Sequence, residues 1–149
     1  MSRLHDITSA EEESFELEFI ENIKAGFPSP SADRTGERID IVKEMTSHPE
    51  TTFYARVDGD SMRDMGILDG DIVVIDRSLE PRDGDVIAAF IDQEFTIKEF
   101  RHDPTHRCGW LIPHNPQFKP IQVTAENNFG IWGVVTHAVH SLRYKKRND

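Results

Sequence analysis

Short apolar runs recur along the chain from Thr51 onward, and clusters of Gly, Pro, Asp and Asn separate them. Runs this short and evenly spaced predict an antiparallel β architecture, either stacked sheets or a partly open barrel. We therefore expect a mainly β domain over residues 49–149. The expected strands are Phe53–Val57, Ile72–Ile75, Val86–Ile91, Phe95–Phe100, Trp110–Ile112, Ile121–Val123 and Ile131–Val139.

The tripeptide Asp-Gly-Asp occurs three times, at 58–60, 69–71 and 83–85, each time beside or before an expected strand. Glycine adopts positive φ without penalty, so Asp-Gly predicts a tight turn. Calcium binding is the alternative for so many acids, but no twelve-residue loop with a closing glutamate is present. The turn interpretation is favoured.

Residues 1–48 follow a different pattern, and we expect them to form a flexible N-terminal arm. Phe15, Leu17 and Phe19 alternate with glutamates, which fits a strand, while Phe15, Phe19 and Ile23 fall at helical spacing. Both interpretations stay open. We expect the arm to lie across the β domain, with its large apolar side chains covering apolar surface there.

Residues 33–48 predict a short helix that Pro49 ends, with Ile39, Val42 and Met45 on one face. Between this helix and the acidic segment lies Lys24-Ala-Gly-Phe-Pro-Ser-Pro-Ser31. Its prolines favour extended backbone. The segment is either a plain linker or a scissile segment, in which the small residues Ala25 and Gly26 would let a nucleophile approach.

Charge and composition narrow the classes of function. The net charge of −10 argues against unaided binding to DNA phosphates or anionic membranes, and residues 1–25 carry −5 of it. The longest apolar run, Val86–Ile91, is far shorter than a membrane span, and no signal peptide is expected. A single cysteine, Cys108, excludes an internal disulfide and fits a reducing compartment. We expect a cytoplasmic protein.

Ser61 and Lys98 are the candidates for nucleophilic chemistry. Ser61 comes just past a turn, where we expect it to be more exposed than a serine in mid-strand. A serine needs a base, and none of the seven histidines falls in a recognisable Ser-His-Asp setting. Lys98 stands inside a strand-like run and becomes neutral near pH 7 only if it is buried. The alternation by itself favours a surface lysine over a buried one.

His102, His106 and Cys108 have a spacing that suggests zinc, but a structural site needs a fourth ligand and none is apparent. We interpret the histidines as loop residues and Cys108 as structural. No metal or cofactor is expected.

Several motifs together resemble the catalytic domain of the LexA/UmuD family of self-cleaving proteins. They are Val57–Met62, Leu68–Asp71, Gly84–Val86, Phe95–Lys98, Leu111–Asn115, Phe118–Ile121 and Gly133–Val139. Upstream, residues 25–33 resemble the segment that UmuD-like members cut. Only a short arm precedes that segment, which is similar to the UmuD-like branch rather than to a repressor with its own DNA-binding domain.

The resemblance implies that Ser61 is the nucleophile, that Lys98 is a buried, neutral general base, and that the bond cut is Ala25–Gly26. Backbone N–H groups around Ser61 would hold the oxyanion. It further implies a homodimer that cleaves itself when RecA filaments form on damaged DNA in the SOS response. The shortened chain would then join a UmuC-like subunit in an error-prone translesion polymerase.

Two alternatives stay open. One is a LexA-like repressor or antirepressor, which would act through a separate DNA-binding partner because the chain is so acidic. The other is a binding module with an inactive site, which the presence of both Ser61 and Lys98 disfavours.

Overall fold

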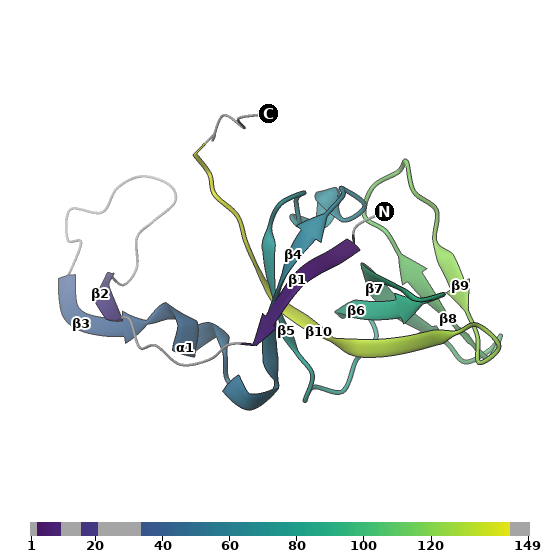
Figure 1. Cartoon of the computed structure of the whole chain (residues 1–149), viewed down its shortest axis with the longest axis horizontal. Coiled ribbons are helices and arrows are strands. Elements are labelled where there is room, and N and C mark those ends of the chain that lie inside the picture. The colour runs from purple at the N-terminus through teal and green to yellow at the C-terminus, as the bar shows by residue number, and fades with distance from the viewer. Residues whose placement is uncertain (1–2, 10–15, 21–33, 144–149) are drawn as a thin grey trace.

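The protein is mainly β, as expected for a LexA/UmuD-type catalytic domain. The structure is a computed structural model that describes residues 3–9, 16–20 and 34–143. Within them, an eight-stranded antiparallel sheet has the order β1-β4-β5-β10-β6-β7-β8-β9, and β2 and β3 form a separate two-stranded sheet (Figure 1). The large sheet is open, with β1 and β9 at its two edges.

Each of the seven expected runs lies in a strand. The strands are β4 (Thr52–Asp58), β5 (Ile72–Asp76), β6 (Val86–Ile91), β7 (Glu94–Asp103), β8 (Cys108–Ile112), β9 (Ile121–Val123) and β10 (Phe129–Val139). The 3-10 turn Pro49–Thr51 precedes β4, and a second 3-10 turn, Arg63–Met65, lies in the loop that follows it.

The long strand β10 joins the two halves of the sheet. Its first half pairs with β6 and its second half with β5, with a register shift in each pairing. Two clusters of buried apolar side chains form the core. The first holds Ala55, Val57, Met62, Ile67, Val73, Ile75, Ala88 and Ile97, and the second holds Ile87, Ala89, Leu111, Val123 and Val134.

The N-terminal third supplies β1 (Arg3–Ser9), β2 (Glu16–Ile20) and β3 (Arg34–Asp40). The strand alternative thus holds for residues 16–20, which pair with β3. Arm and sheet do meet, because β1 pairs with β4. The expectation that Leu17 covers apolar surface is wrong, since 54% of its surface is exposed.

A short helix does lie within residues 33–48 as expected, but Ile39 is not part of it. Residues 34–40 pair with β2 as β3, and α1 covers only Ile41–Met45. The helix starts where it does because Asp40 Oδ1 accepts hydrogen bonds from the N–H groups of Val42 and Lys43. No helix in the described part of the chain is long and apolar enough to cross a membrane.

Two glycines of β10 give a matched test of this packing. A Cβ at Gly133 would lie 2.6 Å from Ile75 Cγ2, whereas a Cβ at Gly130 would meet nothing within 4 Å. We expect Gly133→Ala to lower the free energy of unfolding by about 1–3 kcal/mol through overpacking. Gly130→Ala should leave it unchanged or raise it slightly. Urea unfolding of the two variants measures the difference, and equal stabilities would contradict this packing of β10 on β5.

Candidate functional site

The turn that carries Ser61 is held by two of the Asp-Gly-Asp tripeptides. Gly59 and Gly70 have positive φ, at 103° and 86°, as expected for these turns. The second turn binds the end of β4, because Val57 N–H donates to Asp71 O and Gly70 N–H donates to Val57 O, both at 2.8 Å. The Asp69 carboxylate accepts the Gly59 N–H. These acids therefore stabilise the loop between β4 and β5.

Ser61 is fully buried, and the expectation that it would be exposed is wrong. The chain beyond it folds into the 3-10 turn Arg63–Met65, and Met62 enters the first apolar cluster. The serine is thus anchored between a buried neighbour and the Asp-Gly-Asp turn rather than presented at the tip of a loop.

A second loop, which follows β8, holds the serine turn from the other side. His114 N–H donates to Ser61 O at 2.8 Å, and His114 O accepts from Asp64 N–H at 2.7 Å. Asn115 Nδ2 donates to Asp60 O at 3.0 Å. The sequence analysis included this loop among the family motifs but assigned no role to His114 or Asn115. Residue spacing does not show which loops will contact each other in the fold.

The side chain of His114 ties this loop to β7. Its Nε2 lies 3.1 Å from Glu99 Oε1, and Arg101 Nε donates to Glu99 Oε2 at 2.7 Å. Glu99 directly follows Lys98, so the same strand anchors both the lysine and the loop that clamps Ser61.

Lys98 points into the protein from the middle of β7, and only 1% of its surface is exposed. Its Nζ lies 3.0 Å from Ser61 Oγ. It also contacts Thr96 Oγ1 at 2.7 Å and the carbonyl oxygen of Ile97 at 3.1 Å. The structure therefore brings together the serine and the lysine, which are 37 residues apart in the sequence.

Burial lowers the pKa of Lys98 from 10.5 to about 8. A neutral amine has two N–H donors and one lone pair. With the donors directed at Thr96 Oγ1 and Ile97 O, the lone pair is left to accept the hydroxyl proton of Ser61. This geometry allows an amine to act as a base toward a serine.

Three of the described histidines contact aspartates. His48 contacts Asp76, His106 contacts Asp103, and His140 contacts Asp71. Cys108 is buried and accepts a hydrogen bond from Gln122 Nε2. Across residues 3–9, 16–20 and 34–143, no three His, Cys, Asp or Glu side chains gather as a metal site would require. The predicted scissile pair Ala25–Gly26 lies outside the described residues.

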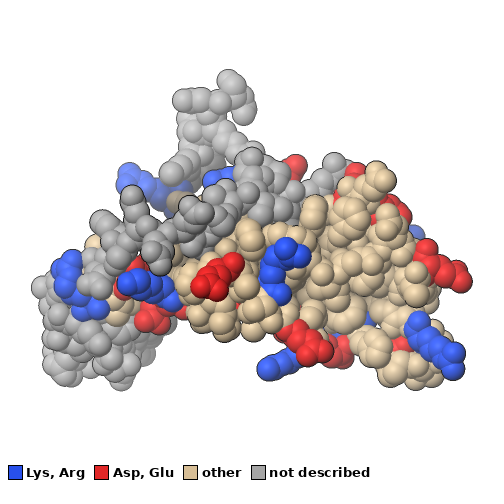
Figure 2. Space-filling model, turned by 60° about the horizontal axis from the view of Figure 1, so that its bottom comes forward, with Lys and Arg blue, Asp and Glu red and all other residues tan. Residues whose placement is uncertain are grey.

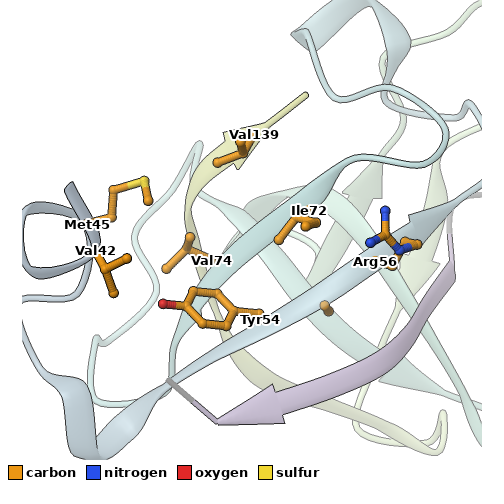
Figure 3. Close-up of a pocket in the computed structure, with 8 residues that line it drawn as sticks. Val42, Met45, Tyr54, Arg56, Ile72, Val74 and Val139 are labelled. Carbon is orange, nitrogen blue, oxygen red and sulfur yellow. The ribbon is translucent and has the colours of Figure 1, made fainter. Parts of the chain in front are cut away.

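An apolar groove lies apart from the serine and the lysine, with a volume of about 510 Å³. Figure 3 shows Val42 and Met45 of α1 on one side of it, facing Tyr54 and Val74 on the sheet. The pKa of Tyr54 is raised by burial and by the charge of Asp40. Val42 and Met45 thus share a face, as the sequence predicted, and the groove lies between α1 and the sheet.

Comparison with known proteins agrees with this geometry. The family model described as "Peptidase S24-like" matches residues 18–136. The chain belongs to this family. The matched region contains Ser61 and Lys98, and it extends from β2 into β10.

Individual relatives are similar to this chain over most of its length. Protein SamA of Salmonella typhimurium is 39% identical over 84% of this chain and 85% of its own length. Protein MucA of Escherichia coli is 38% identical over 81% of this chain and 82% of its own length. A LexA repressor from Bifidobacterium adolescentis is 37% identical over 74% of this chain but only 42% of its own length. The resemblance to the LexA/UmuD group of self-cleaving serine peptidases is confirmed.

The buried lysine should make stability depend on pH. Because the pKa of Lys98 is lower in the folded chain than in the unfolded one, the unfolded chain binds more protons between pH 8 and 10.5, and stability rises with pH there. We expect wild type to gain on the order of 3 kcal/mol relative to Lys98→Met as the pH rises from 7 to 11. Urea unfolding across this range measures the gain.

Lys119→Met, at an exposed lysine, is the control and should show no such gain. A difference between wild type and Lys98→Met that stays constant with pH would mean that Lys98 titrates normally.

Proposed function

We propose that this chain is a UmuD-like accessory protein of an error-prone translesion polymerase, which activates itself by cutting its own arm at Ala25–Gly26. The observation that carries the proposal is the buried lysine amine 3.0 Å from a buried serine hydroxyl, with a pKa lowered toward neutrality. Membership of the self-cleaving peptidase family supports it.

The reaction starts with the neutral amine of Lys98, which takes the proton of the Ser61 hydroxyl while Oγ attacks the carbonyl carbon of Ala25. Backbone N–H groups around Ser61 stabilise the oxyanion that forms. The lysine ammonium then gives its proton to the nitrogen of Gly26, which leaves as an amine. Ala25 is now joined to Ser61 as an ester.

Water completes the reaction. Lys98, neutral again, takes a proton from the water that attacks the ester, and the ester bond to Ser61 Oγ breaks. Ser61 recovers its proton from the ammonium. The products are residues 1–25, which end in a new carboxylate, and residues 26–149, which begin with a new amine.

Two observations favour a UmuD-like role over a repressor. They are the share of each relative's length that matches this chain and the distribution of charge on the surface. SamA and MucA match over more than four-fifths of their length, whereas the LexA repressor matches over 42%. On the face shown in Figure 2, the described Lys and Arg side chains are interspersed with Asp and Glu. This surface offers no concentrated positive charge for DNA phosphates. A repressor or antirepressor role through a separate DNA-binding partner is the alternative.

In the proposed role the protein is a homodimer. RecA filaments on damaged DNA stimulate the cut, and a UmuC-like polymerase subunit receives the shortened form. Cleavage cuts the covalent link between β1 and the rest of the sheet, and it removes five of the ten net negative charges. Both changes alter the surface that the new partner meets.

The cut and its two residues are tested by intact-mass measurement after incubation at alkaline pH or with RecA filaments. We expect a fragment that begins at Gly26. Ser61→Ala removes the nucleophile and Lys98→Ala removes the base, so each should abolish the cut. Ser141→Ala and Lys119→Ala, at exposed positions, are the matched controls and should cleave normally. A different new N-terminus would refute the assigned bond, and cleavage at the normal rate in Lys98→Ala would refute the base.

The pH dependence of unassisted cleavage is a separate test. Since only the neutral amine is a base, the rate should rise with pH and level off above about 8, the pKa of Lys98. A histidine base would level off near its ordinary value of about 6.5. Single-turnover rates from pH 6 to 10 distinguish the two, and a plateau already complete at pH 7 would count against the lysine.

A further inference from the structure

The N-terminal strand β1 occupies the edge of the strand that leads to Ser61. It pairs antiparallel with β4 at five positions, from Arg3 opposite Asp58 to Ser9 opposite Phe53. Without β1, the remaining strand partner of β4 in the sheet is β5. The start of β1 lies beside the end of β4, three residues before Ser61 in the chain.

The same strand also contacts β7, which carries Lys98, although β1 and β7 are not paired in the sheet. β8 pairs with β7 from Glu99 to Asp103 and not along the stretch that precedes Glu99. β1 therefore contacts both the strand that leads to Ser61 and the strand that carries Lys98. Figure 1 shows β1 alongside β4 and on the side of β7.

The strands that bound the predicted scissile segment lie elsewhere. Ile20 ends β2 and Arg34 begins β3, and this pair stands at the opposite end of the molecule from β7 (Figure 1). Of the described strands in the N-terminal third, β1 is therefore the one that lies against β4 and β7.

A peptidase holds the chain it cuts in an extended form, and a strand edge provides the backbone donors and acceptors for this. One edge of one strand accepts a single partner, because each backbone N–H and C=O is used once in a ladder. Two extended segments that need the same edge must therefore exclude each other.

We infer that the outer edge of β4, facing β7, is the binding site for the extended segment around Ala25–Gly26, and that β1 occupies this site in the resting chain. The inference rests on the proposed function and adds its regulation. β1 acts as a built-in competitor, so the chain cuts itself only in molecules where β1 has left. The ladder suits this role because it is short and is interrupted between His5 and Thr8.

The test compares two double-proline variants of the full chain. Adjacent residues of a strand direct their N–H groups to opposite sides, so Leu4→Pro/His5→Pro must remove a ladder donor. Asp6→Pro/Ile7→Pro, in the interruption of the register, is the matched control. If β1 holds the edge in nine molecules of ten, the first variant should cleave itself about tenfold faster than wild type. The control should stay within about twofold of wild type.

A second readout does not depend on cleavage. In Ser61→Ala protein, the Leu4→Pro/His5→Pro change should speed hydrogen exchange at residues 3–9 and slow it at residues 21–33. Protection of β4 should persist, because the edge changes partner. Unaltered exchange at residues 21–33, or equal acceleration of cleavage by both proline pairs, would overturn the inference.

The two proposals fail in different ways. If wild type never cleaves, the proposed function fails, while the exchange experiment still reports on the β4 edge. If wild type cleaves and the first proline pair leaves its rate unchanged, the competition by β1 is refuted and the peptidase assignment stands.

Discussion

The removal of the Lys98 amine from water is the interaction on which the candidate site depends. A lysine on the surface would be charged at neutral pH and useless as a base. Burial lowers its pKa to about 8, and Thr96 Oγ1 and the Ile97 carbonyl fix its orientation. The lone pair of the neutral amine, which these two contacts do not use, faces Ser61 Oγ. The fold therefore accepts a buried ionisable group, which costs stability below about pH 10.5, and in the proposed mechanism it gains a poised base.

The position of the serine depends on contacts between loops that are far apart in the chain. The first two Asp-Gly-Asp turns are joined by the hydrogen bond from Gly59 N–H to the Asp69 carboxylate, and Gly70 N–H binds the end of β4 at Val57 O. The loop after β8 then clamps the serine turn through the backbone of His114, whose side chain is tied to Glu99. Backbone groups make several of these contacts, and the side chains of His114 and Asn115 complete the clamp.

Catalysis and its control converge on one strand in the proposed mechanism. β4 ends in the turn that carries Ser61, and its outer edge pairs with β1. A strand edge is a reusable binding surface, because its ladder groups recognise backbone rather than particular side chains. The same edge can therefore receive β1 at rest and a different segment during reaction. An arm that is held by a short, interrupted ladder leaves more readily than one packed into the core.

The sequence by itself determined the seven strands of the β domain and their turns, because alternation and Asp-Gly chemistry are local. It also pointed to Ser61 and Lys98 through a family resemblance. It left open whether residues 16–20 form a strand or a helix, and it placed Ile39 of β3 on a helix, because both depend on which segment pairs with which. Alternation alone favoured a surface position for Lys98, and turn position favoured an exposed Ser61. Only the tertiary structure decided that both are buried, because burial depends on what the rest of the chain packs over a residue.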